Sequence, residues 1–171
     1  MNVGKERRAI EYLKAFEPQS EPYYGCYSGG KDSDVIRILM QLAGVRHELH
    51  HNLTTVDAPE TVWYIKSIPD VIIDRPKKNM SELIVEKKFP PTRLARYCCQ
   101  RLKERGGQGR IKVTGVRWAE SASRKDNSGL IRIIGKPKTA ISIAEHEKAN
   151  FTKTNMGGWF LMTTTTHRAV S

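Results

Sequence analysis

The segment that most constrains the fold is a six-residue turn, Ser-Gly-Gly-Lys-Asp-Ser, at residues 28–33. Residues 23–27, which precede it, are rich in β-forming types, and an apolar pattern with helical spacing follows over residues 35–43. A strand that turns through two glycines into a helix directs several backbone N–H groups, and the positive end of the helix dipole, at one point. The pattern therefore predicts a site for phosphate, pyrophosphate or sulfate.

The side chains of this turn suit the same ligand. Lys31 supplies a positive charge, Asp32 a carboxylate that can hold Mg²⁺, and Ser33 a hydroxyl donor. The spacing is not that of a Walker A loop, and an ordinary surface turn is the plainer alternative. We expect the anion to be bound by Ser28, Gly29, Gly30, Lys31, Asp32 and Ser33.

Strands and helices alternate along the first two thirds of the chain. Apolar patterns and turn residues predict strands at 23–27, 45–53, 71–73 and 110–116, with helices at 6–16, 35–43 and 92–105. A further helix is expected to start at Asp57 and continue through 62–67, and another to follow Asn79 and include 83–85. Asp57 with Glu60, and Asn79 with Glu82, have the spacing of helix-starting capping boxes. This order predicts an α/β protein with a parallel sheet and right-handed crossovers.

In parallel sheets ligands bind beyond the carboxyl ends of the strands. Ser28, residues 54–57 and Arg117 each follow a predicted strand. We therefore expect them to share one site.

Four segments resemble one known family. They are the turn at 28–33, Thr-Thr-Val-Asp-Ala-Pro-Glu-Thr at 54–61, Arg-Tyr-Cys-Cys at 96–99 with Leu102 and Lys103, and Thr-Gly-Val-Arg-Trp-Ala-Glu-Ser at 114–121 with Arg124. In this order they resemble the phosphoadenosine phosphosulfate (PAPS) reductase family, within the adenine nucleotide α-hydrolase superfamily of N-type ATP pyrophosphatases. The resemblance covers about residues 20–130.

The resemblance implies a Rossmann-like (HUP-type) three-layer sandwich with a mostly parallel, twisted sheet. It also implies that residues 28–33 form the pyrophosphate (PP) loop and that Thr55, Asp57 and Lys103 contact the nucleotide. Arg117 and Arg124 correspond to the family's arginine motif, and guanidinium groups suit phosphate and sulfate. The implied catalytic set is Lys31, Asp32, Arg117 and Arg124.

The implied function is that of a PAPS-reductase-like enzyme acting on an adenylated sulfate. The expected ligand is an adenine nucleotide: PAPS, adenosine phosphosulfate (APS) or ATP, the last with Mg²⁺. Two alternatives stay open. One is an ATP pyrophosphatase that adenylates a substrate, as in sulfur modification of tRNA or DNA, with a sulfur-carrier protein as a further partner. The other is a non-catalytic nucleotide-binding remnant.

Cys98 and Cys99 are adjacent, and in iron–sulfur members of the resembled family such a pair helps to bind a [4Fe–4S] cluster. That cluster takes four thiolates, and Cys26, the third cysteine of the chain, falls inside a predicted strand. We therefore do not expect a complete cluster from this chain alone. His50 and His51 also lie in a strand, where successive side chains face opposite ways, and we expect both to be structural.

The pattern weakens after residue 128. Short strands are predicted at 130–134 and 157–162, as an excursion outside the main sheet. We divide the chain into an adenine-nucleotide-binding domain at 1–128 and an incomplete C-terminal extension of it at 129–171. Proteins of the resembled family continue further and carry a nucleophilic cysteine near their end, so we expect a truncated copy, with a minimal form as the alternative.

The formal net charge of +11 is concentrated in one part of the chain. Residues 93–138 carry thirteen Lys and Arg against three acids. Such a field attracts polyanions, either a phosphorylated small molecule or a nucleic acid, and a solvated basic surface is the alternative. With no signal-peptide pattern and no apolar run of membrane-spanning length, we expect a cytoplasmic protein without a membrane partner. Homodimerisation stays open.

Overall fold

The computed structural model describes residues 3–104, 106–107, 110–115, 131–133 and 159–163. The elements in chain order are α1 (Val3–Ala15), β1 (Tyr23–Cys26), α2 (Lys31–Ala43), β2 (His47–Asn52), α3 (Pro59–Lys66), β3 (Val71–Asp74), α4 (Met80–Lys87), the π-helical turn η1 (Cys99–Lys103), β4 (Ile111–Gly115), β5 (Ile131–Ile133) and β6 (Trp159–Thr163).

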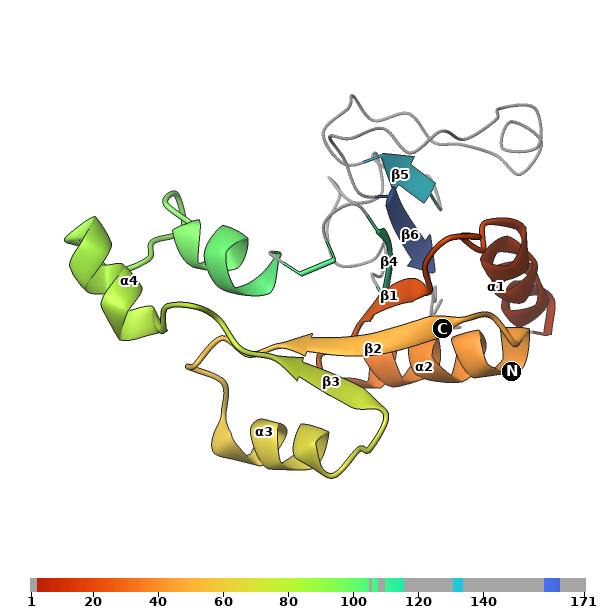
Figure 1. Cartoon of the computed structure of the whole chain (residues 1–171), viewed down its shortest axis with the longest axis horizontal. Helices are drawn as coiled ribbons and strands as arrows, with labels where there is room; N and C mark the ends of the chain where they lie inside the picture. Colours follow the sequence, from red (N-terminus) through yellow and green to blue (C-terminus); the bar gives the residue numbers. More distant parts are fainter. Residues whose placement is uncertain (1–2, 105, 108–109, 116–130, 134–158, 164–171) are drawn as a thin grey trace, which may run out of the picture.

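The strands form one sheet in the order β3-β2-β1-β4-β6-β5 (Figure 1). All neighbouring pairs are parallel except β5 with β6, which is antiparallel. The chain therefore has an α/β, Rossmann-like fold with a mostly parallel sheet, as the sequence predicts. None of the described helices combines the length and apolarity needed to cross a membrane.

Two sequence-based expectations about elements are wrong. Residues 92–105 were expected to be one helix, but helical backbone begins only at Tyr97 and runs through η1 to Lys103. Thr92 and Ala95 instead close a turn: the Thr92 N–H donates to the Ala95 carbonyl, and the Ala95 N–H donates to the Thr92 hydroxyl. These bonds replace those that a helix would make. Strands β5 and β6 also continue the main sheet, because β6 pairs with β4.

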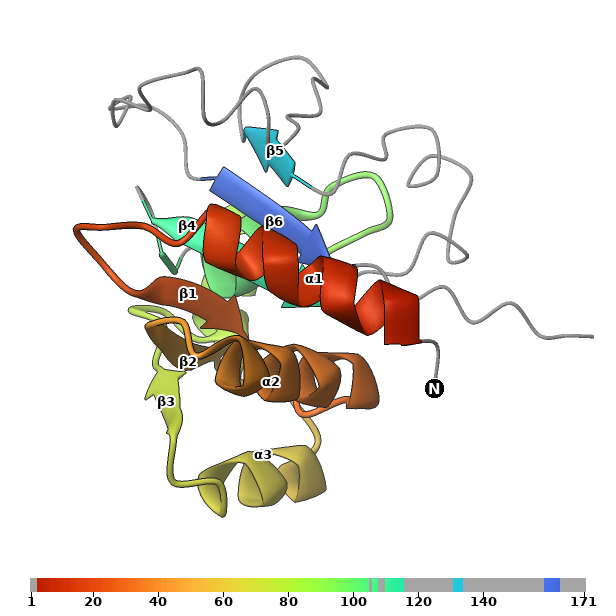
Figure 2. The same cartoon turned by 90° about the vertical axis from the view of Figure 1, so that its right-hand side faces the viewer.

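One face of the sheet carries the hydrophobic core. Along each strand, side chains that point into this core alternate with side chains that point to the opposite face of the sheet. Helices α1, α2 and α3 cover the core face (Figure 2). The Tyr23 hydroxyl donates to the Leu13 carbonyl at 2.8 Å and so ties β1 to α1. The fully buried members are Leu13, Tyr23, Ile36, Met40, Leu49, Ile65 and Val113.

The opposite face of the sheet is polar. Tyr24 stacks on His50 with ring centroids 4.1 Å apart, and the backbone at Gly106 and Gly107 passes directly over the tyrosine ring. The Lys112 ammonium donates to the Glu104 carbonyl at 3.3 Å. Among the described residues, those that follow η1 therefore cover this face around Tyr24.

Candidate functional site

The glycine loop, residues 27–30, lies at the carboxyl end of the central strand. It joins β1 to α2, and β1 pairs with β2 on one side and β4 on the other. The strand order therefore reverses between β1 and β4, next to this loop. In open α/β sheets such a reversal marks the ligand-binding crevice.

The two glycines of the loop have different structural roles. Gly29 has φ +78°, and a Cβ there would lie 3.1 Å from the Ile65 side chain. Gly30 has φ −97°, which any residue can adopt, and a Cβ there would meet only the Ser28 hydroxyl, at 3.6 Å. Gly29 is thus required by the backbone and by α3, whereas Gly30 faces open space that a ligand can enter.

Hydrogen bonds inside the loop hold its helical end. The amides of Ser33 and Asp34 donate to the Gly30 carbonyl at 2.9 and 3.1 Å, and the Ser33 hydroxyl donates to the same oxygen at 2.6 Å. The Ser28 hydroxyl donates to that of Ser33 at 3.3 Å. Ser33 is buried and already uses its hydrogen, so its role in the structure is to shape the loop.

The amides on the open side of the loop have no hydrogen-bond acceptor within the described part of the chain. No hydrogen bond between described residues takes its N–H from Gly29, Gly30 or Lys31. Gly29 and Gly30 precede the 13-residue helix α2 and Lys31 is its first residue, so the positive dipole end of the helix lies here. Lys31 is exposed and Asp32 half-buried. Together these groups form a site with the chemistry that an anion requires.

Strand β2 and helix α2 fix the strand end of the loop. His51 Nδ1 donates to the Tyr27 carbonyl at 3.0 Å, and the Tyr27 hydroxyl donates to Asp34. Burial, followed by this carboxylate, raises the pKa of Tyr27 far above its usual range. The phenol therefore stays protonated as a donor. Because His51 is buried, the peptide immediately before Ser28 is held from the core side.

The turn after β2 differs from its expected form. Asp57 was predicted to cap α3, but Ala58 occupies the N-cap position and caps it with no side chain. The Asp57 carboxylate turns back and accepts the Thr54 N–H at 2.7 Å. Thr55 has φ +66°, unusual for a β-branched residue, and its hydroxyl accepts the Met80 N–H at 2.9 Å. The two expected nucleotide contacts thus both have structural partners.

Strand β4 ends at the same carboxyl edge of the sheet as the glycine loop. A Cβ on Gly115 would lie 2.7 Å from the Asp32 carbonyl oxygen, so the end of β4 packs against the first turn of α2. Arg117 follows two residues later, but Arg117 and Arg124 lie outside the described residues. Lys103 is exposed at the end of η1 and forms no ion pair with the described residues of the loop.

The cysteines do not form a cluster site in the described part of the chain, where no three His, Cys, Asp or Glu residues are placed to hold a metal. All three thiols are free and half-buried. Cys99 Sγ accepts a hydrogen bond from Arg96 at 3.6 Å. Cys26 lies on β1, and burial raises its pKa to about 11.

A polar network on the second face of the sheet was not predicted. His50 Nδ1 lies 2.8 Å from Asp74, and its Nε2 lies 3.2 Å from Glu48, which also pairs with Arg110 at 2.7 Å. The Tyr24 hydroxyl donates to Asp74 at 2.9 Å. A cavity of about 390 Å³ adjoins this network. The alternation of Glu48, His50 and Asn52 along β2 was the available signal.

His50 and His51 face opposite sides of the sheet and bind different partners, as expected from the strand.

The fold defines an α/β protein of the Rossmann-like class. No known protein family and no curated protein matches the sequence.

Proposed function

We propose that the glycine loop binds the anionic part of an adenine nucleotide and that the chain is a PAPS-reductase-like enzyme. The observation that carries this proposal is the set of amides at Gly29, Gly30 and Lys31, which no described residue engages, at the start of α2 and beside the reversal of strand order. Backbone donors in this arrangement are preorganised for a phosphate or sulfate group.

The chemistry of such a site is positioning and charge stabilisation. Gly30 leaves room for the anion, Lys31 contributes a positive charge, and Asp32 a carboxylate for Mg²⁺ if the ligand is ATP. Arg117 and Arg124 complete the proposed site, by resemblance to the family's arginine motif. The proposed substrates are PAPS or APS, with ATP as the substrate under the adenylating alternative.

Titration calorimetry of the full chain with PAPS, APS, ATP with Mg²⁺, and free sulfate tests the proposal. We expect at least one nucleotide to bind more tightly than sulfate. Lys31→Ala should weaken that binding by about tenfold, the scale of one charge-assisted contact. Lys66→Ala removes another exposed helical lysine, one outside the site, and should leave binding unchanged. If no nucleotide binds better than sulfate, the proposal is wrong.

A Gly30→Ala variant locates the ligand. The added methyl group meets only the Ser28 hydroxyl within the chain, so the fold should tolerate it. An anion held against the loop amides would be displaced by that methyl group, and we expect at least a tenfold loss of affinity. Unchanged nucleotide affinity in a folded Gly30→Ala protein would place the ligand elsewhere.

A further inference from the structure

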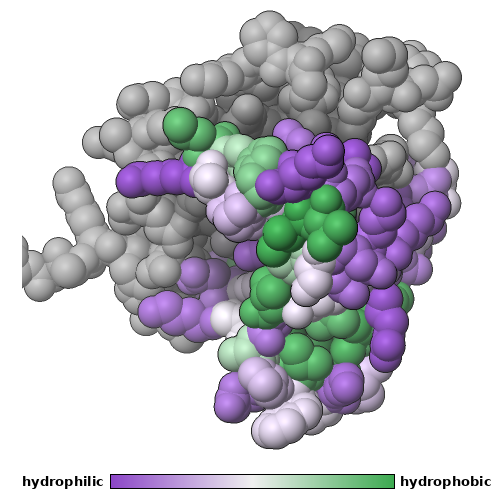
Figure 3. Space-filling model, turned by 90° about the vertical axis from the view of Figure 1, so that its left-hand side faces the viewer, coloured by the Kyte–Doolittle hydropathy of each residue, from purple (hydrophilic) through white to green (hydrophobic). Residues whose placement is uncertain are grey.

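Residues 77–103 form an arm that begins at the carboxyl edge of the sheet. The arm comprises α4, the connection through Pro90 and Pro91, and η1. Figure 1 shows α4 at the far end of the molecule from α1, and Figure 3 faces the side on which the arm lies. The Thr55 hydroxyl, in the turn after β2, accepts the first amide of α4. The arm is thereby tied to the edge that carries the glycine loop.

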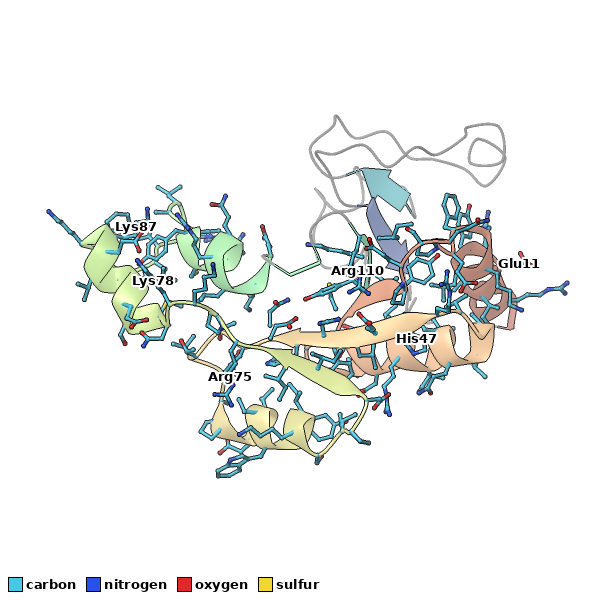
Figure 4. All side chains as sticks on the ribbon, viewed as in Figure 1. Glu11, His47, Arg75, Lys78, Lys87 and Arg110 are labelled. Carbon is cyan, nitrogen blue, oxygen red and sulfur yellow. The ribbon has the colours of Figure 1, made fainter. Side chains whose placement is uncertain are left out.

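The arm is strongly basic. It contains eight Lys and Arg against two Glu, a balance of +6. Seven of the eight cations are exposed and Lys87 is half-exposed. Lys78 and Lys87 lie on α4 and beside it in Figure 4, well apart from Glu11 on the body. A positive charge of this density on a projecting element favours a polyanion.

Few of these charges are neutralised within the arm. Lys78 forms an ion pair with Glu86 at 2.7 Å. The other acid, Glu82, completes the capping box of α4 with Asn79. Among the residues whose positions are described, no carboxylate lies within ion-pair distance of the remaining seven cations, which are Lys77, Lys87, Lys88, Arg93, Arg96, Arg101 and Lys103.

Aromatic and apolar side chains are exposed among these cations. Phe89 is 43% exposed and packs edge-to-face on Tyr97, with centroids 5.7 Å apart. The Tyr97 hydroxyl donates to the Phe89 carbonyl at 2.7 Å, which fixes the pair. An exposed aromatic ring held among cations suits a nucleobase, because every base offers a face for stacking.

We propose that this arm binds single-stranded nucleic acid, with its cations on the phosphates and Phe89 stacked on a base. Three arginines among the cations favour phosphate, because the guanidinium fork donates two parallel hydrogen bonds. An anionic membrane fits less well. The eight-residue helix α4 turns Leu83 into the protein, so it offers no continuous apolar face of the kind that interfacial helices use. The inference is independent of the nucleotide proposed for the glycine loop.

Fluorescence anisotropy of the full chain with a labelled 25-nucleotide single strand, at several salt concentrations, tests the proposal. Lys87→Gln/Arg93→Gln/Arg101→Gln should weaken binding by ten- to a hundredfold near 0.1 M salt and reduce the salt dependence by about two units, since each phosphate contact contributes about 0.7. Arg8→Gln/Lys14→Gln/Lys66→Gln removes the same charge from exposed positions on α1 and α3 and should bind like the unmodified protein.

A second variant pair tests the stacking contact. Phe89→Ala should weaken binding by about tenfold, in the range of one base stack. Val85→Ala truncates a more exposed apolar residue of the arm, 77% exposed, and should have no effect. Circular dichroism and thermal unfolding verify that all variants are folded.

Three results would overturn the proposal. They are equal losses in the arm and control variants, equal or tighter binding of a 25-base-pair duplex, and binding to vesicles of anionic phospholipid but not to the oligonucleotide. Nucleotide calorimetry on the same proteins separates this proposal from the previous one. Gly30→Ala should lose the nucleotide and keep the oligonucleotide, and the arm variant should do the reverse. If both proposals hold, nucleic acid becomes the candidate acceptor under the adenylating alternative.

Discussion

Gly29 combines two constraints at a single residue: a positive φ and contact with Ile65 of α3. Gly29→Ala should therefore destabilise the fold by about 1–3 kcal/mol, from backbone strain of about 1–2 kcal/mol and the crowded methyl group. Urea unfolding measures this loss. Gly30→Ala serves as the control and should change the free energy of unfolding by less than about 1 kcal/mol. Equal losses at both positions would show that Gly30 is also structurally required.

Gly107, on the polar face of the sheet, also combines a positive φ with a close neighbour. Its φ is +62°, and a Cβ would lie 2.5 Å from the Tyr24 ring. Gly107→Ala should cost about 2 kcal/mol or more, because both the backbone and the stacked Tyr24 would have to move. Urea unfolding together with near-ultraviolet circular dichroism checks this prediction. A variant as stable as the parent, with an unchanged aromatic signal, would contradict it.

Single residues also show where sequence reasoning stops. The position of the glycine loop could be predicted because β-forming residues precede the two glycines and apolar residues at helical spacing follow them. Asp57 could not, because a capping carboxylate and one that accepts the Thr54 amide have the same local sequence. Likewise, the partner of Thr55 is Met80, 25 residues away, and no local pattern encodes it.

At the scale of elements, α4 is held by local contacts more than by burial, since Leu83 is its one buried residue. Its capping box is complete, with both the Asn79 side chain and Glu82 engaged. Asn79→Ala should cost about 1 kcal/mol and should accelerate amide exchange in α4 while leaving α2 protected. Hydrogen-exchange mass spectrometry measures this. Uniform acceleration in both helices would contradict a local effect.

Two ion pairs connect residues that are distant in the sequence, and both predict acid sensitivity. Arg37 binds Asp70 through two hydrogen bonds, of 2.9 and 2.8 Å, and lowers the pKa of that carboxyl. Arg110, followed by His50, lowers the pKa of Glu48. Because both pKa values are lowered by folding, the stabilisation is present above the ordinary carboxyl range and is lost as pH falls through the folded pKa values.

Stability should therefore decrease between about pH 5 and pH 2, by a modest amount because both carboxyls are more than a third exposed. Asp70→Asn/Glu48→Gln should flatten this part of the profile, as measured by urea unfolding across that range. Glu60→Gln, an exposed carboxyl in no ion pair with a described residue, should leave the slope unchanged. Identical slopes in all three proteins would contradict the assignment.

Element type was predictable from periodicity over most of residues 3–115, and boundaries less so. The helix expected at 92–105 failed because a threonine turn after two prolines uses the backbone groups at its start. The sheet position of β5 and β6 depends on pairing with β4, which is distant in sequence. Pairing of this kind is set by tertiary packing, which a single sequence does not reveal.

At the scale of the whole molecule, ligand binding and folding are linked. A nucleotide that binds only the folded chain should raise the unfolding free energy by about 2.7 kcal/mol at a hundred times its Kd. Thermal unfolding with increasing nucleotide measures this increase, which Gly30→Ala should abolish. An equal increase in Gly30→Ala would show that the stabilising site lies away from the loop.

The fold class could be predicted from the alternation of strands and helices in the sequence, but the placement of the arm at residues 77–103 could not.

The three cysteines differ in their surroundings, and this difference should allow selective labelling of the protein. Cys26 is half-buried within the sheet and its pKa is raised to about 11, so it is almost entirely an unreactive thiol at neutral pH. Cys98 and Cys99 lie at the start of η1. A maleimide dye should therefore attach to this pair first, in the unmutated chain. Occupancy of the arm could then be followed optically, without introducing any foreign residue.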